Sequence, residues 1–167
     1  AHREAAAADA ELSADRRQRE DGHGCAPAVA IALLPPSASH QGRAAENILS
    51  KILIKKGDII PGNMYFTTTR LHQEMAGGKF EDIIIDEAHD PENEFPFKGN
   101  VDMKKLERLI EKHGAKKIPY VSMATSVNMA GGQPISMQNL KELRVLTKKH
   151  KIRIIHDMTR VAENAYF

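Results

Sequence analysis

The chain has 167 residues, of which 41% are hydrophobic and 28% are charged, a composition typical of one globular domain with a sizeable core. The formal net charge of +2 gives no electrostatic reason to expect nucleic acid or a membrane surface as a partner. No apolar run is long enough to span a bilayer, and the single cysteine, Cys25, excludes an intrachain disulfide framework and suits a reducing compartment. We therefore expect a cytoplasmic protein with no nucleic-acid and no membrane partner.

A change in composition near residue 40 divides the chain. Residues 1–40 contain twelve alanines, four arginines and no lysine, whereas residues 41–167 contain fourteen lysines and six arginines. Large apolar side chains are almost missing before Val29, so this stretch cannot bury enough surface to offset its ordering entropy. We predict a flexible or foreign leader at 1–39, without ordered structure, followed by one partial domain at 40–167.

Predicted helices and strands alternate from Gln41 onward. In chain order the pattern predicts a helix at 44–55, a strand at 63–67, a helix at 68–76, a buried strand at 80–86, a loop at 90–99, a helix capped by Asp102 and ending at His113, a strand at 118–123, a helix capped by Ser136 and ending near His150, and a strand at 151–156. This alternation indicates an α/β fold with a mostly parallel sheet and helices on both faces. In such sheets ligands bind at the carboxyl ends of the strands.

Four short stretches carry the candidate functional residues. They are His40–Asn47, Pro61–Arg70, Ser126–Pro134 and Ile155–Arg160. In the first, a glycine directly before a helix leaves backbone N–H groups free to face an anion, and the helix dipole adds to the attraction. The second puts an aromatic ring at a predicted strand end, and the third and fourth follow strands with amide, carboxylate and guanidinium groups.

The order and spacing of these four stretches resemble those of the tyrosine phenol-lyase and tryptophanase family, from His40 to Phe167. The resemblance implies the fold of the aspartate aminotransferase type (fold type I), of which this chain would be a truncated large domain. It also implies pyridoxal 5′-phosphate as the cofactor. For the full-length family it further implies a bound monovalent cation (K⁺) and assembly as a homotetramer.

The resemblance assigns the cofactor's phosphate and ring to two of the stretches. Gln41, Gly42 and Arg43 match the segment that grips the phosphate. Phe66 matches the aromatic side chain that stacks on the pyridine ring. No resident metal site is expected within this chain, because the histidines and the single cysteine show no zinc-ligand spacing.

The resemblance assigns the polar contacts with the cofactor's ring to the other two stretches. Asp157 matches the carboxylate that pairs with the pyridine nitrogen, and such a pairing favours the protonated ring that accepts electrons from the substrate. Asn128 and Arg160 match groups that approach the cofactor's phenolic oxygen. Asp157 and Arg160 are therefore the expected catalytic residues. His156 and Met158, which flank Asp157, stand in place of the residues more usual in the family.

The implied reaction is β-elimination from an aromatic L-amino acid. Thr67 is the expected substrate-proximal residue, because tyrosine phenol-lyases have Phe-Thr-Thr-Thr-Arg here, whereas well-known tryptophanases have aspartate in place of this first threonine. Tyrosine, giving phenol, pyruvate and ammonia, is favoured over tryptophan, which would give indole. The lysine that bonds to the cofactor lies downstream of the Asp-x-x-Arg segment in the family, and no lysine of this chain sits in its motif. We therefore predict that the chain is inactive alone.

Two other interpretations compete. Asp86-Glu87-Ala88-His89 resembles the acidic motif of a DEAH-box helicase, in which the aspartate holds Mg²⁺. Against a helicase, no phosphate-binding Gly-x-x-x-x-Gly-Lys-[Ser/Thr] loop occurs in the sequence. The second alternative is a non-catalytic remnant that only binds a partner.

Overall fold

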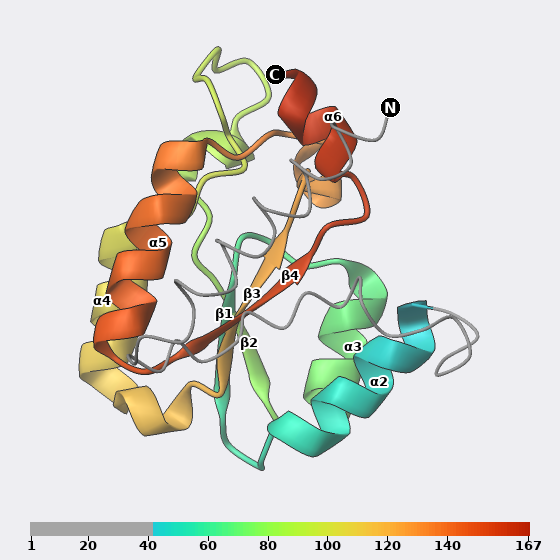
Figure 1. The fold of residues 1–167 in the computed structure, drawn as a ribbon, viewed down its shortest axis with the longest axis vertical. Coiled ribbons are helices and arrows are strands. Elements are labelled where there is room, and N and C mark those ends of the chain that lie inside the picture. The colour runs from blue at the N-terminus through green and yellow to red at the C-terminus, as the bar shows by residue number, and fades with distance from the viewer. Residues whose placement is uncertain (1–41) are drawn as a thin grey trace, which may run out of the picture.

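The computed structural model describes residues 42–167, which form a four-stranded sheet with flanking helices (Figure 1). In chain order the elements are α2 (Gly42–Leu53), β1 (Ile59–Gly62), α3 (Thr67–Met75), β2 (Lys79–Asp82), η2 (Asp86–His89), α4 (Met103–His113), η3 (Ala115–Lys117), β3 (Tyr120–Ala124), η4 (Asn128–Ala130), α5 (Met137–Lys149), β4 (Arg153–Asp157) and α6 (Val161–Tyr166). The predicted leader at 1–39 and Gln41 lie outside the described residues. Within 42–167, no helix combines the length and the apolar character needed to cross a bilayer.

The strands are all parallel and lie in the order β2-β1-β3-β4. Each helix that connects two strands returns antiparallel to them, so the strands end and these helices begin at one edge of the sheet, which we call the carboxyl edge. Figure 1 shows α2 and α3 on one side of the sheet and α4 and α5 on the other. We call these sides the α2/α3 face and the α4/α5 face. The predicted parallel sheet with helices on both faces is confirmed.

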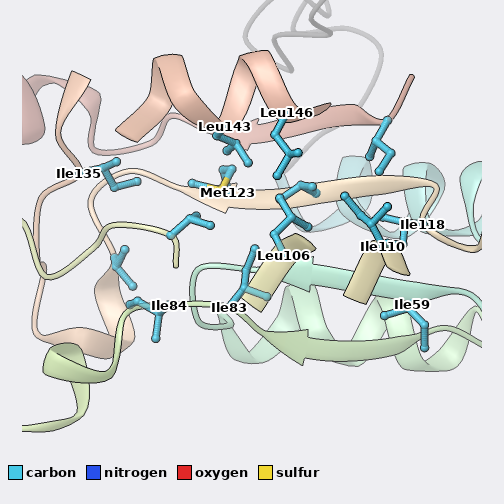
Figure 2. Close-up of a cluster of buried hydrophobic side chains, with 14 residues drawn as sticks. Ile59, Ile83, Ile84, Leu106, Ile110, Ile118, Met123, Ile135, Leu143 and Leu146 are labelled. Atoms are coloured by element: carbon cyan, nitrogen blue, oxygen red, sulfur yellow. The ribbon is translucent and has the colours of Figure 1, made fainter. Parts of the chain in front are cut away.

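The α4/α5 face holds the main apolar core. Leu106 and Ile110 of α4 and Leu143 and Leu146 of α5 form one buried cluster with Met123 of β3 and nine further residues (Figure 2). Complete burial of one such side chain stabilises a fold by about 1.5–3 kcal/mol. This cluster therefore fixes β1, β3 and β4 against the two helices.

The α2/α3 face is more polar. Its buried apolar cluster consists of Ile54, Ile60 and Tyr120. Side chains alternate along a strand, so Ser122 points to the same face as Tyr120. There the Ser122 hydroxyl accepts a hydrogen bond of 3.3 Å from the amide of Gln73, which is 1% exposed. Hydrogen bonds rather than apolar contacts hold much of this face together.

The predicted helices are confirmed, including the two N-caps. The Asp102 carboxylate accepts hydrogen bonds from the backbone N–H groups of Lys104 and Lys105, at 2.8 and 3.1 Å. The Ser136 hydroxyl accepts one from the N–H of Asn139 at 3.1 Å. These bonds satisfy N–H groups that have no partner within the helix, which is why such residues begin helices.

The predicted strand at 63–67 is wrong, because the strand there is β1, which ends at Gly62. Asn63 leaves the ladder and uses its fully buried side chain instead. Its amide nitrogen donates to the carbonyl oxygens of Gly99 and Ala124, at 3.1 and 3.0 Å, and its amide oxygen accepts from the N–H of Ala124 at 2.9 Å. The side chain thus replaces backbone pairing at the carboxyl edge.

The predicted strand at 80–86 is too long, because β2 ends at Asp82. The Asp82 carboxylate accepts hydrogen bonds from the N–H groups of Ile84 and Met64, at 2.9 and 3.1 Å, and turns the chain. Ile83 and Ile84 are fully buried, but Ile84 pairs antiparallel with Val101 outside the named strands. A run of apolar residues indicates that a segment is buried, but burial alone does not distinguish a strand from a buried connecting segment.

Candidate functional site

A pocket opens on the α2/α3 face at the carboxyl edge, and it contains Phe66 and Asp157. Asp157 pairs in register with Ala124, and strand alternation places both on the face to which Tyr120 points. The remaining walls come from α3, the segment before it, β2 and β3, and include Tyr65, Thr69, Arg70, Gln73, Phe80 and Ser122. Two predicted site residues that are far apart in sequence therefore line one pocket.

Asp157 is the last residue of β4 and is partly buried. One of its oxygens, Oδ1, accepts hydrogen bonds from the backbone N–H and the hydroxyl of Thr159, at 2.9 and 2.5 Å. Its other oxygen, Oδ2, has no hydrogen-bond partner among residues 42–167. The carboxylate is thus held in orientation while one oxygen remains able to meet an external N–H donor or cation.

Phe66 occupies the N-cap position of α3, in extended backbone, and its side chain is 38% exposed. Thr67, the predicted substrate-proximal residue, is the exposed first residue of the helix. Because Phe66 precedes the first helical turn, its ring is carried by a fixed backbone rather than by a loose loop. The ring therefore has a defined place at the pocket and an uncovered surface for a planar ligand.

Gly42 and Arg43 are the first residues of α2, and both are exposed. A Cβ atom built on Gly42 would meet nothing within 4 Å, so packing within the described chain does not require glycine there. The first turn of α2 contains no acidic residue to neutralise the helix dipole. The first N–H groups of a helix have no partner within the helix, and no atom of residues 42–167 fills the space beside Gly42, as an anion site needs. Gln41, the third predicted phosphate contact, is outside the described residues.

Asn128 and Arg160 are both exposed and do not line the pocket of Phe66 and Asp157. Asn128 begins η4, in the connection that follows β3. Arg160 is fixed near this connection, because its backbone N–H donates to the Thr125 carbonyl at 3.1 Å and its guanidinium lies 3.8 Å from where a Cβ of Gly132 would be. The structure brings both residues to the carboxyl edge, where no hydrogen bond joins them to each other.

His156 joins the ends of β3 and β4 in a way that sequence reasoning missed. Its Nε2 atom is hydrogen-bonded to the Thr125 hydroxyl, and the backbone N–H of Thr125 donates to the Asp157 carbonyl at 3.0 Å. Burial lowers the pKa of His156, and the nearby Asp157 carboxylate opposes this shift in part. A neutral imidazole can therefore hold Thr125 beside Asp157 near neutral pH.

Sequence reasoning also missed several lining residues of α3 and the segment before it. Thr69 and Gln73 are one helical turn apart and share a face, which is the signal that could have found them. The guanidinium carbon of Arg70 lies 5.0 Å from the centre of the Tyr65 ring, and the hydrogen bond of Arg70 to Glu74 raises the pKa of Arg70. These contacts add a cation and a second aromatic ring to the pocket wall.

The acidic stretch that resembles a helicase motif lies on η2, away from the pocket. The Asp86 carboxylate accepts a hydrogen bond of 2.6 Å from the ammonium group of Lys105, and this contact lowers the pKa of Asp86. In the described part of the chain, no three His, Cys, Asp or Glu side chains gather to hold a metal ion. An ion pair with lysine thus accounts for the charge of Asp86.

Solved structures with a similar fold define the class of this domain. The aspartate aminotransferase of Thermotoga maritima matches with a TM-score of 0.51 and 18% identity, over 70% of this chain and 28% of that chain. An archaeal alanine:glyoxylate aminotransferase matches with a TM-score of 0.53 and 24% identity, over 70% and 27%. The described residues have the fold of aspartate-aminotransferase-type enzymes, as predicted.

Sequence comparison then shows the family. A family model described as beta-eliminating lyase matches residues 30–167, and the chain belongs to this family. Relatives called tyrosine phenol-lyase include those of Nostoc punctiforme (67% identical) and Pasteurella multocida (62%), each over 129 residues and 77% of this chain. The chain spans 28% of the length of these curated relatives. The resemblance seen in the four sequence stretches is confirmed.

Proposed function

We propose that the chain forms the cofactor-facing part of a pyridoxal-5′-phosphate-dependent lyase that converts L-tyrosine to phenol, pyruvate and ammonia. The observation that carries this proposal is the meeting of Phe66 and Asp157 in one pocket on the α2/α3 face. Membership of the β-eliminating lyase family and relatives called tyrosine phenol-lyase support it.

The side chains that line the pocket suit the pyridine ring of this cofactor. Phe66 offers an uncovered ring surface for stacking, and Asp157 has one oxygen without a partner among the described residues. An anionic carboxylate beside the ring nitrogen favours its protonated form. When bound, the cofactor supplies the electron sink that stabilises negative charge at the substrate's α-carbon. Asp157 keeps that sink effective by holding a proton at the ring nitrogen.

The start of α2 fits the phosphate. Gly42 and Arg43 offer backbone N–H groups and a guanidinium at a helix end that lacks an acidic first turn, and we assign Gln41, which precedes them in sequence, to the phosphate as well. Because α2 and α3 cover the same face, the phosphate end and the ring pocket belong to one side of the sheet.

The remaining predicted site residues also have proposed roles. Asn128 and Arg160 donate hydrogen bonds to the cofactor's phenolic oxygen, and Arg160 and Asp157 act as the catalytic pair. Thr67 contacts the substrate. No lysine of residues 42–167 lines the pocket, and we propose that the cofactor-bonding lysine and part of the K⁺ site are supplied by the full-length family protein, which would act as a homotetramer.

Binding of pyridoxine 5′-phosphate tests the cofactor site. This probe has the ring and the phosphate but no aldehyde, so surface lysines cannot capture it covalently. We expect Asp157→Asn to weaken binding by about tenfold, because a charge-assisted contact is lost, and to lower the pKa of the bound ring nitrogen, followed by ultraviolet absorption. Asp86→Asn, the same change at an exposed carboxylate, is the control. Equal affinity of both variants and the unaltered chain would refute the site.

A chimera tests the reaction. Residues 39–167 replace the matching segment of the Pasteurella multocida relative, and pyruvate release from L-tyrosine and L-tryptophan is measured. We expect release from L-tyrosine, and a loss of preference for it in the Thr67→Asp chimera, because an added carboxylate changes the charge beside the substrate. Release from tryptophan alone would overturn the substrate assignment, and release from neither by a folded chimera would overturn the activity.

A further inference from the structure

Glu46 is a carboxylate that no predicted role uses, although it lies between the two halves of the proposed cofactor site. It stands one helical turn after Gly42 in α2, and its side chain is 20% exposed. Its oxygen Oε1 accepts a hydrogen bond of 2.6 Å from the Thr69 hydroxyl, and Oε2 accepts one of 3.3 Å from Thr68. Both threonines belong to the first turn of α3.

The first turn of α3 needs such a partner. Phe66, at its N-cap, makes no side-chain capping bond, and the turn contains no acidic residue of its own. A negative charge near a helix start is stabilising, because it opposes the positive end of the helix dipole. Glu46 supplies this charge from the neighbouring helix.

His72 adds to the same cluster. Its Nδ1 atom is buried, has no hydrogen-bond partner among the described residues, and lies 3.6 Å from Oε2 of Glu46. Glu46 therefore faces two hydroxyl groups and one imidazole from α3, lies near the Tyr120 phenol of β3, and forms no ion pair with a lysine or arginine of residues 42–167.

We infer that Glu46 is a positioning residue that holds the phosphate-binding start of α2 in register with the ring-stacking start of α3. This inference rests on the proposed function. In α2, Gly42 and Arg43 precede Glu46 by one turn or less, and in α3, Phe66 and Thr67 precede Thr69. One carboxylate thus links the two helix starts, and one turn of helix on each side transmits its position to the ligand contacts. Glu46 itself does not line the pocket of Phe66 and Asp157.

Two ligands separate positioning from general stabilisation. Pyridoxine carries the ring alone, and pyridoxine 5′-phosphate carries the ring and the phosphate, so the ratio of their dissociation constants measures the gain from binding both ends together. Both constants are measured by equilibrium dialysis on the 167-residue chain. In Glu46→Ala we expect this ratio to fall by about tenfold, because a charge-assisted hydrogen bond no longer fixes the two helix starts, while pyridoxine affinity changes little.

Glu46→Gln keeps an oxygen that can accept from Thr69, and we expect it to restore most of the ratio. It also serves as the second variant if Glu46→Ala does not fold, with a partial fall in the ratio then expected from the lost charge. Glu111→Ala, an exposed carboxylate of α4 with no hydrogen bond or ion pair among the described residues, is the matched control.

The outcomes distinguish this inference from the function on which it rests. If the unaltered chain binds the phosphorylated ligand more tightly than pyridoxine and the Glu46 variants keep the same ratio, the positioning role is overturned and the cofactor site stands. If the unaltered chain gains nothing from the phosphate, the proposed cofactor site falls and the role of Glu46 falls with it.

Discussion

The two faces of the sheet are built from different interactions. On the α4/α5 face, fourteen buried apolar residues form one continuous cluster. On the α2/α3 face, the buried apolar cluster has three residues, and Glu46, Gln73 and Ser122 make hydrogen bonds between elements. The candidate site lies on the second face. One face therefore holds the larger apolar core, whereas the other uses directed bonds to place the proposed ligand-binding groups.

The largest effect is expected from opening a cavity in the α4/α5 face. Leu143 has no exposed surface, and Leu143→Ala should lower the free energy of unfolding by about 2–5 kcal/mol, because the space left is only partly refilled. Urea unfolding measures the change. Val145→Ala, on the same helix but 72% exposed, should change it by less than about 0.5 kcal/mol. Similar losses in both variants would contradict the assignment of the core to this face.

A smaller loss in the free energy of unfolding is expected at Asn63, where hydrogen bonds rather than apolar contacts stabilise the structure. Asn63→Ala leaves backbone groups of Gly99 and Ala124 without their side-chain partners, at a cost of about 1–3 kcal/mol for an unsatisfied buried group. Asn93→Ala removes only a local bond to Phe95 in an exposed loop. If the two variants unfold at the same urea concentration, directed bonds do not stabilise the carboxyl edge.

The smallest effect is expected from the protonation of His156. Its pKa is lowered by burial in the folded chain, so below about pH 6.5, the ordinary histidine pKa, the unfolded chain takes up a proton before the folded chain does. Stability is therefore complete above this pH and is lost as the pH falls further. The free energy of unfolding should decline less between neutral and mildly acidic pH in His156→Gln. Parallel pH profiles for the two proteins would rule out this contribution.

Local patterns identified most of the elements correctly. The caps at Asp102 and Ser136 and the helical spacing after Thr67 depend on neighbours in sequence, so they could be recognised without a structure. The strand ends could not. Asn63 lies beyond the end of β1, where its side chain binds the backbone of Ala124, and the Asp82 carboxylate ends β2 by accepting from the N–H of Ile84. Both strand ends depend on hydrogen-bond partners or turns that a pattern of apolar residues does not encode.

The candidate site likewise combines residues that sequence motifs could identify with residues that only the packed structure could identify. Phe66, Asp157 and the start of α2 stand in motifs whose order and spacing identify the family from sequence alone, because each motif is local. Glu46, Gln73 and the bond between Thr125 and His156 depend on packing between α2, α3, β3 and β4. The sequence by itself determined the family, the alternation of helices and strands, and the residues expected to face a cofactor. Only the tertiary structure decided which face carries them and which polar groups hold them in place, since hydrogen bonds between distant segments exist only after the chain has packed.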